Sequence, residues 1–202
     1  MAAARSPRTD DQLTPGARRI LEVASELFYQ RGIHAVGVDT IAAESGVTKR
    51  TLYDRFGSKD GLLLAYLESR DRRWRDLVGA RLDAVPPEDR VRRVLVPFEV
   101  LPEWLAASER GCSFINAFAE LPEPDHPGRQ VVVAEKKWLR TLFHELLVEA
   151  GAARPDELAV QLLTLHEGAI VSNAIAEEPS AAQLAHAAAR TLVTAALGDP
   201  PG

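Results

Sequence analysis

The residues best suited to chemistry lie in one short, polar stretch of the chain. Between Val38 and Leu62 the sequence reads VDTIAAESGVTKRTLYDRFGSKDGL, with hydrogen-bonding and cationic side chains close together. Side chains of these types contact the phosphate oxygens and base edges of DNA. The candidate DNA contacts are Thr48, Lys49, Arg50, Thr51, Tyr53 and Lys59. We expect Thr48 to cap a helix whose first backbone N–H groups then face an anion.

Two short helices joined by a tight turn must position these side chains. Apolar residues mark segments 39–44 and 49–56, and Gly46 lies in the turn between them. Leu52 and Phe56 should anchor the second segment to its neighbours, which leaves its polar side chains facing outward. This arrangement is the layout of a helix-turn-helix.

The rest of the sequence predicts an all-α protein. Thr14-Pro15 should begin a helix that Gly32 ends, and Ser58 should begin one that continues to about residue 83. Helical spacing of apolar residues predicts further segments at 90–100, 103–109, 113–120, 130–150, 155–176 and 181–197. The predicted organisation is a flexible arm over residues 1–13, a DNA-binding domain over 14–62 with its connector helix, and a C-terminal helical domain over 84–202.

The composition excludes several classes of protein. The chain has 202 residues and a net charge of -5. Residues 1–83 carry 14 Lys and Arg against 12 Asp and Glu, whereas the remainder carries 10 against 17. This mildly basic N-terminal part of the chain is suited to contact with DNA. No apolar run reaches the roughly 18 residues of a membrane span, and the first residues are no signal peptide. We therefore expect a cytoplasmic protein without a membrane partner.

Catalysis and metal binding have little support in the sequence. The single cysteine, Cys112, excludes an internal disulfide and a Cys-rich zinc module. The five histidines show no metal-ligand spacing, and Ser113 lacks the Gly-x-Ser-x-Gly context of a nucleophile. We predict no enzyme activity, no metal site and no cofactor.

The run from Ala17 to Leu62 resembles the N-terminal DNA-binding domain of the TetR family of bacterial transcriptional regulators. The matching pieces are LFYQRG, then I-A-x-x-x-G-V-T-x-x-T-L-Y-x-x-F, then G-S-K-D-x-L. The later stretch GCSFINAFAELPEPDHPGR also resembles a regulatory segment seen in some members. The resemblance implies a homodimer that binds a palindromic operator, and a small-molecule pocket in the C-terminal helices that regulates release from DNA.

Two positions depart from the pattern of this family. The family often has Ser or Thr at the position of Gly37, where the side chain caps a helix and touches phosphate. Glycine still serves as an N-cap, but it provides no side-chain contact. At the position of Arg50 the family often has a small residue. An arginine there could read guanine.

Aromatic side chains in the second half of the chain are candidates for the effector pocket, although a plain core role is the alternative for most of them. The candidate ligand-binding residues are Phe98, Trp104, Phe114, Asn116, Phe118, Trp138 and His166. Because this half is acidic, we expect a mostly apolar effector with one or two hydrogen-bonding groups. The arginine-rich segment 70–75 is interpreted as a solvated helix face.

Two uncharged stripes near the end of the chain predict a dimer interface. The candidate interface residues are Leu162, Ala169, Ile170, Asn173, Leu184, Ala188 and Leu192. Two such stripes favour a four-helix interface with two helices from each subunit, and the alternative is that they pack inward on their own chain. His166 shares the first stripe and should meet a polar partner near the two-fold axis.

The sequence therefore predicts a DNA-binding transcriptional regulator, more in keeping with a repressor than an activator. Two alternatives stay open: a small helical enzyme or carrier with an incidental helix-turn-helix, and a DNA-binding regulator without a ligand.

Overall fold

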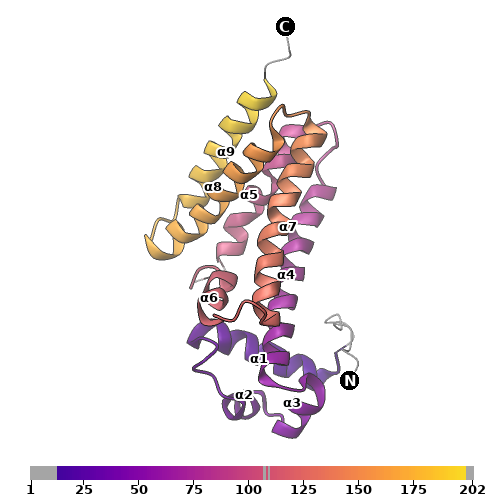
Figure 1. Cartoon of the computed structure of the whole chain (residues 1–202), viewed down its shortest axis with the longest axis vertical. Helices are drawn as coiled ribbons and strands as arrows, with labels where there is room; N and C mark the ends of the chain where they lie inside the picture. The colour runs from indigo at the N-terminus through magenta and orange to yellow at the C-terminus, as the bar shows by residue number, and fades with distance from the viewer. Residues whose placement is uncertain (1–12, 107, 109, 199–202) are drawn as a thin grey trace. The chain divides into compact units, whose positions relative to one another are not determined.

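A computed structural model of the chain describes residues 13–106, 108 and 110–198. Within these ranges the regular elements are nine α-helices, so the all-α prediction is confirmed (Figure 1). They are α1 (Pro15–Arg31), α2 (Val38–Ser45), α3 (Lys49–Phe56), α4 (Lys59–Asp83), α5 (Arg90–Ala106), α6 (Ser113–Glu120), α7 (Pro127–Ala150), α8 (Pro155–Ile175) and α9 (Ala181–Leu197). The flexible arm predicted for residues 1–13 lies, except for Leu13, outside the described residues.

The helices group into two compact units. The first unit contains the described residues up to Arg72 together with Ser113–Val132, and the second contains Arg73–Cys112 together with the described residues from Val133 onward. Helices α4 and α7 each contribute one end to each unit. This grouping differs from the predicted division near residue 84, because α6 and the first turns of α7 belong with the helix-turn-helix.

Local sequence signals fix where the helices of the first unit begin. The Thr14 hydroxyl accepts a hydrogen bond from the Ala17 N–H at 3.4 Å, and Ser58 Oγ accepts one from the Gly61 N–H at 2.9 Å. These caps satisfy backbone donors that have no partner inside the helix. Gly46, with φ 68°, ends α2 in the left-handed conformation that glycine adopts without steric cost.

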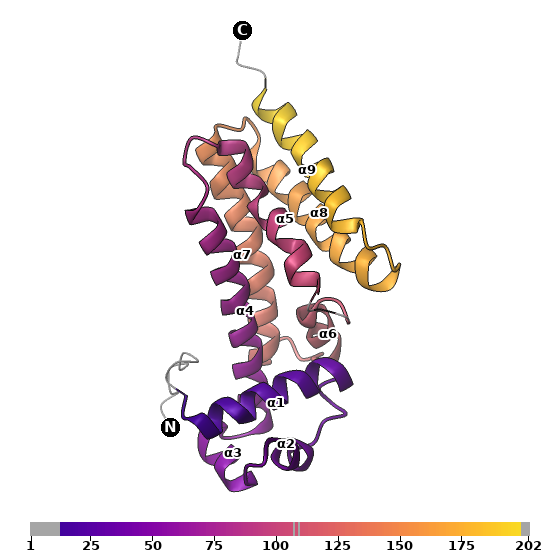
Figure 2. The ribbon, with the colours of Figure 1, turned by 180° about the vertical axis from the view of Figure 1, so that it is seen from behind.

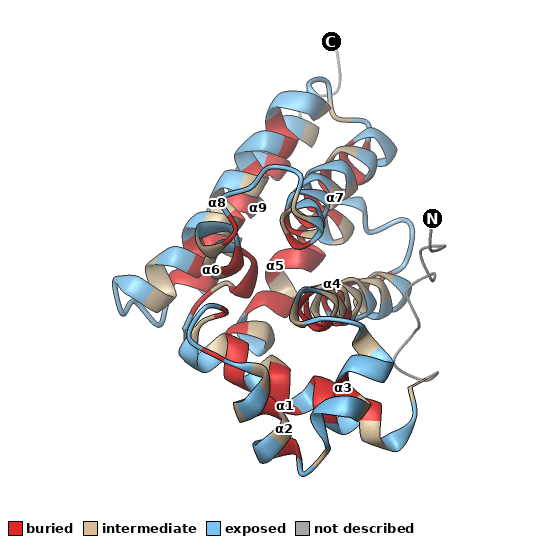
Figure 3. Cartoon of the chain, turned by 60° about the horizontal axis from the view of Figure 1, so that its bottom comes forward, coloured by how far each residue is buried: buried red, intermediate tan, exposed pale blue. Residues whose placement is uncertain are grey.

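The core of the first unit is built on α1. Its buried face carries Ile20, Ala24 and Leu27, and Ile41 of α2 and Leu52 of α3 are fully buried in the same unit (Figure 3). Full burial of one such leucine or isoleucine contributes about 1.5–3 kcal/mol to the stability of the fold. This core fixes the orientation of the two short helices.

Helix α5 is longer than the sequence predicts. Segments 90–100 and 103–109 were expected to be separate, but α5 runs from Arg90 to Ala106 with Pro97 and Pro102 inside it. An interior proline costs roughly 3 kcal/mol. The continuous buried face of α5, which includes Phe98 and Leu101, offsets this cost by filling the core of the second unit. The prediction of a break was wrong for that reason.

Helices α5, α7, α8 and α9 form the main core of the second unit, and α8 and α9 lie side by side (Figures 1 and 2). Among the described helices, α8 is the one with the length and hydropathy of a membrane span. Its apolar composition has a simpler explanation. Leu158, Leu162 and Ile170 on one face of α8 are buried in the core of this unit.

Candidate functional site

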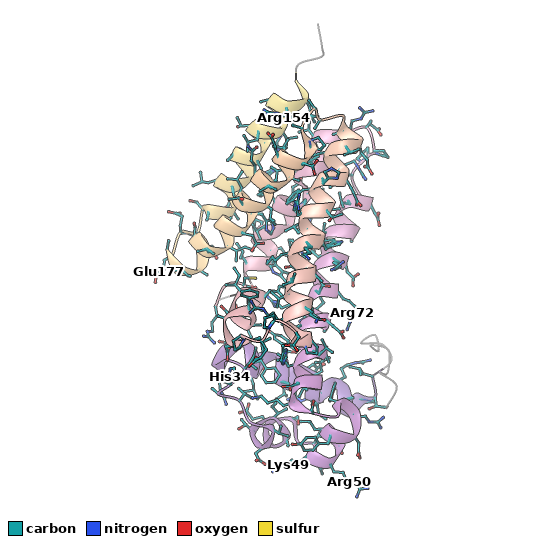
Figure 4. The ribbon with its side chains drawn as sticks, viewed as in Figure 1. His34, Lys49, Arg50, Arg72, Arg154 and Glu177 are labelled. Atoms are coloured by element: carbon teal, nitrogen blue, oxygen red, sulfur yellow. The ribbon has the colours of Figure 1, made fainter. Side chains whose placement is uncertain are left out.

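Helix α3 presents most of its polar side chains to solvent while one leucine holds it in place. Leu52 is fully buried, and α3 packs on both α1 and α2. Lys49, Arg50 and Tyr53 are exposed, and Figure 4 shows Arg50 projecting away from the helices of this unit. The predicted contacts Thr51 and Lys59 are half-buried, and Thr48 is exposed. The outer face of α3 is therefore accessible along its length.

The N-terminus of α3 is arranged to receive an anion. Thr48 Oγ1 accepts a hydrogen bond from the Thr51 N–H at 3.2 Å, so the predicted cap is present. The first turn carries no acidic residue. The partial positive charge of a helix N-terminus, together with its free N–H groups, stabilises a phosphate placed there.

The cations on α3 are held only by exposed ion pairs. Lys49 pairs with Asp39 of α2, and Arg50 Nε lies 3.8 Å from Asp54 Oδ2. The Arg50 side chain is 91% exposed. Exposed pairs of this kind contribute little, typically below about 1 kcal/mol. Both cations can therefore exchange their carboxylate partners for phosphate or a base edge.

A carboxylate on α6 fixes the loop between α1 and α2. Glu120 accepts hydrogen bonds from the N–H of Ile33 at 3.0 Å and the N–H of His34 at 2.9 Å, and it lies 3.2 Å from His34 Nδ1. Gly32 precedes this loop with φ 88°, and a Cβ there would lie 3.2 Å from Glu120 Oε1. This contact links α6 to the helix-turn-helix within the first unit.

We expect Glu120→Gln to destabilise the protein at pH 7 but not in acid. Partial burial raises the pKa of Glu120, but hydrogen bonds from His34 and Ile33 outweigh it and hold this pKa below its ordinary value. A carboxyl group with a lowered folded pKa stabilises the fold above its unfolded pKa, and that contribution disappears as the pH falls through the folded value. The expected loss at pH 7 is about 1–2 kcal/mol.

Urea unfolding of Glu120→Gln at pH 7 and at pH 3 measures this effect. The exposed neighbour Glu123 provides the control, because Glu123→Gln removes the same charge outside the loop contact. An equal loss of stability for the two variants at pH 7 would contradict the assigned role of Glu120.

The second unit contains an aromatic cluster formed by Trp74 of α4, Phe98 and Trp104 of α5, Phe143 of α7 and His166 of α8. The ring centroid of His166 lies 5.5 Å from Trp74, 5.5 Å from Phe98 and 6.4 Å from Phe143. Trp104 packs on Trp74 at 5.2 Å. Three other helices, α4, α5 and α7, thus place aromatic rings against one buried histidine of α8.

A polar group borders this aromatic cluster. Lys136 Nζ lies 2.9 Å from Glu167 Oε1, 3.0 Å from Glu135 Oε2 and 3.7 Å from Cys112 Sγ. Burial lowers the pKa of Lys136, but Cys112, Glu135 and Glu167 outweigh it and raise this pKa above its ordinary value. Lys136 is therefore charged at neutral pH and is paired within the second unit.

Comparison with known proteins identifies the family. Residues 20–66 match the sequence profile described as "Bacterial regulatory proteins, tetR family". The HTH-type transcriptional activator FasR of Mycolicibacterium smegmatis is 32% identical over 163 residues, which cover 78% of this chain and 73% of that protein. The chain belongs to the TetR family. It is a DNA-binding transcriptional regulator, as the sequence predicts.

Two further relatives of this TetR-family regulator are informative. The crystal structure of SCO4454, a TetR-family transcriptional regulator from Streptomyces coelicolor, has a TM-score of 0.83 and 32% sequence identity, and the match covers 90% of this chain and 96% of that one. The HTH-type transcriptional repressor KstR2 of Rhodococcus jostii is 33% identical over 84 residues, which cover 39% of this chain and 41% of that protein. The relatives thus include a named activator and a named repressor.

The predicted ligand-binding residues of this TetR-family chain are divided between the two units. Phe98, Trp104 and His166 belong to the aromatic cluster, and Trp138 lies in the same unit with the Arg75 guanidinium 4.6 Å above its ring. The other three, Phe114, Asn116 and Phe118, lie on α6 and belong to the first unit, where α6 buries Phe114. Phe118 is 41% exposed, and the Arg129 guanidinium lies 3.7 Å from the centroid of its ring. The grouping of these three residues with His166 in one effector pocket stays a prediction.

Trp74 is a site residue that the sequence interpretation missed. Segment 70–75 was interpreted as a solvated helix face because of its arginines. Trp74 is nevertheless buried, and Arg70 and Arg75 lie over the rings of Tyr29 and Trp138 at 5.5 and 4.6 Å. The missed signal was the continuation of the apolar stripe of α4, through Tyr66 and Leu67, to positions 74 and 78.

The two predicted interface stripes of this TetR-family regulator differ in their burial. Leu162, Ala169 and Ile170 of α8 are buried in the core of their own unit, so the expectation that they face a partner is wrong. His166 is buried there as well, and the Asn173 side-chain amide donates a hydrogen bond to the Glu178 carbonyl at 3.5 Å. The predicted interface residues of α9 are exposed: Leu184, Ala188 and Leu192.

The face of α8 opposite its core is also free of charge. Val160, Thr164, Gly168, Val171 and Ile175 are all exposed and recur at helical spacing. Ile175 is 79% exposed and Leu184 of α9 is 62% exposed. Exposed apolar side chains at helical spacing are typical of interaction surfaces.

Proposed function

We propose that this regulator is a homodimeric repressor that reads a palindromic operator with α3 and is released by a small, mostly apolar effector. The observation that carries the DNA-binding part is the outer face of α3, which combines an anion-accepting N-terminus with exposed cations. The name of KstR2 as a repressor supports repression, although FasR is named an activator.

In this proposal the six DNA contacts divide into two groups. Arg50 reads a base edge in the major groove, because its guanidinium can form paired hydrogen bonds to guanine. The other contacts bind phosphates and fix the position of α3 on the duplex: Thr48, Lys49, Thr51, Tyr53 and Lys59.

The proposed dimer uses the exposed, uncharged faces of α8 and α9. Each subunit contributes two helices, and burial of Ile175, Val171 and Leu184 against their counterparts supplies the hydrophobic contact. A two-fold axis matches a palindromic operator, whose half-sites lie about 34–36 Å apart when the reading helices enter successive major grooves.

The proposed effector site is the aromatic cluster of the second unit. Its rings offer an apolar surface, and buried polar atoms of Trp74 and His166 have no hydrogen-bond partner among the described residues. Apolar sites with a few convergent polar groups are typical of small-molecule binding.

A gel-shift titration at low salt tests the proposal, with the DNA that flanks the gene of this protein as the target. We expect a saturable shift that competes with the same DNA but not with scrambled sequence. Measurement of a reporter gene behind that DNA, with and without the regulator, distinguishes repression from activation. A shift that depends on DNA length but not on sequence would contradict operator recognition.

We expect Lys59→Ala to weaken binding to all DNA sequences alike. Loss of one phosphate contact should lower the slope of log affinity against log salt concentration by about one unit. Arg154→Ala provides the matched control, because Arg154 is an exposed cation at the start of α8 (Figure 4). The same change of slope in both variants would show that Lys59 acts only through net charge.

A further inference from the structure

Three nitrogen atoms in the second unit are buried and have no hydrogen-bond partner among the described residues. They are Trp74 Nε1 and the two ring nitrogens of His166. Trp74 is 3% exposed and His166 is 2% exposed. Buried polar atoms in native proteins are nearly always paired, so exceptions require an explanation. Three exceptions in one place point to a polar group of a ligand.

The three atoms lie on two rings that contact each other. The centroids of Trp74 and His166 are 5.5 Å apart, and Phe98 and Phe143 pack on His166 from α5 and α7. Trp104 covers Trp74 at 5.2 Å. The surroundings of the unpaired nitrogens are thus aromatic carbon, which suits a ligand with a flat or cyclic apolar body.

The Glu167 carboxylate favours one of the two proton positions on the His166 ring. His166 Nδ1 lies 3.6 Å from Glu167 Oε1, which is beyond hydrogen-bond length, but the carboxylate still favours a proton on Nδ1. Burial lowers the pKa of His166 and outweighs the opposing effects of Glu167 and of the Pro97 backbone carbonyl, so the ring is neutral at pH 7. A neutral ring protonated at Nδ1 has an acceptor at Nε2. The Trp74 indole can only donate.

We propose that Trp74 and His166 together bind the hydroxyl group of a neutral phenol or alcohol with an aromatic or alicyclic body. The hydroxyl oxygen accepts the hydrogen bond of Trp74 Nε1–H, and the hydroxyl proton is donated to His166 Nε2. A hydroxyl group matches this donor and acceptor pair, whereas a methyl group leaves both unpaired. The inference rests on the proposed effector function and names the chemical class of the effector.

Charge around the aromatic cluster argues against an anionic ligand. Glu135 and Glu167 surround Lys136, so two carboxylates stand against one ammonium group on α7 and α8. On α4 the Arg75 guanidinium lies over Trp138. A carboxylate or phosphate entering beside His166 would approach Glu167 and lose its hydration. A neutral hydroxyl avoids both costs.

Isothermal titration calorimetry of the full chain with matched probes tests the proposal. The first pair is 2-naphthol and its methyl counterpart 2-methylnaphthalene, and 2-naphthoate is the anionic probe. The second pair, p-cresol and p-xylene, makes the same comparison with smaller molecules in case the site is too small for naphthalene. We expect the hydroxyl member of at least one pair to bind about tenfold more tightly than its methyl counterpart, as one well-placed hydrogen bond allows. The naphthoate should bind more weakly than the naphthol.

Two variants remove the proposed partners while keeping the ring shapes. Trp74→Phe and His166→Phe should each reduce the preference for the hydroxyl probe to within about twofold. Trp104→Phe removes the indole N–H of the neighbouring ring and should keep the preference. Without a probe, the melting temperature of Trp74→Phe and His166→Phe should be unchanged or higher, because each loses an unpaired buried polar atom.

Four results would overturn the proposal. They are equal binding of the hydroxyl and methyl probes to the wild-type chain, tightest binding of the naphthoate, a preference that survives in Trp74→Phe, and no binding of either pair at 1 mM. The first, second and fourth need no variant, so a variant that fails to fold does not prevent a decision.

A gel shift without probe separates this inference from the proposed function. If operator binding is normal but any of the four results above is found, the proposed DNA-binding function stands and the hydroxyl-binding site is rejected. If the probes bind as expected but 2-naphthol does not change operator binding, the site is confirmed and its role in release from DNA is rejected.

Discussion

Replacement of Ala188 by glutamate is expected to convert the proposed dimer to a monomer and to lower operator affinity by at least about a hundredfold. Ala188 lies in the middle of the exposed stripe of α9, so two glutamates would meet across the proposed two-fold axis without partners. A monomer loses the gain in affinity that comes from linking two half-site contacts, which is roughly 10²–10⁴-fold. Sedimentation velocity and gel-shift titration measure the two effects.

The control for this experiment lies on the same helix. Thr194 is exposed but lies on another side of α9 from the stripe, so Thr194→Glu adds the same charge outside the proposed interface. Val171→Glu tests the exposed face of α8 in the same way as Ala188→Glu tests α9. Ala169→Glu is unsuitable, because Ala169 is 4% exposed and a charge there would disrupt the core. If Ala188→Glu and Val171→Glu remain dimeric with unchanged operator affinity, the interface lies elsewhere.

Replacement of Arg50 by alanine is expected to cost about 1–3 kcal/mol of operator binding, or roughly 5- to 150-fold in affinity. The loss should be confined to operators with the preferred base at one position of each half-site, so the variant should become less selective there. Gel-shift titration against operators substituted at each position in turn measures this change of preference.

Two other variants show whether Arg50 acts through its shape or its charge. Arg50→Lys keeps the positive charge, so its operator affinity should depend on salt concentration as that of the wild-type chain does. Lysine cannot form the paired hydrogen bonds of a guanidinium, so the base preference should be lost. Lys59→Ala should weaken every operator equally. Unchanged affinity of Arg50→Ala for the natural operator would exclude a role for Arg50 in base recognition.

The helix-turn-helix could be predicted from the sequence because its signals are local. Thr14, Thr48 and Ser58 cap helices through hydrogen bonds that span only three residues. Gly46 marks the turn, and the burial of Leu52 follows from the spacing of apolar residues. These features need no knowledge of the distant chain, so the sequence also identifies the polar face of α3.

The Glu120 contact and the aromatic cluster could not be predicted in the same way. Glu120 reaches the N–H groups of Ile33 and His34 across 86 to 87 positions of sequence. Trp74 and His166 come from helices far apart in the chain and meet in one cluster. No local sequence pattern predicts these contacts between distant residues, because they depend on how complete helices pack against one another.

The chain by itself determined the helices, their caps and the polar face of α3, since each depends on neighbours within a few residues. Only the tertiary structure decided which faces of the C-terminal helices are buried. Helix α8 is uncharged on two opposite faces, so its periodicity does not distinguish the stripe of Leu162 and Ile170 from that of Val171 and Ile175. Packing in the second unit makes the choice: it buries the first stripe in the core and leaves the second exposed.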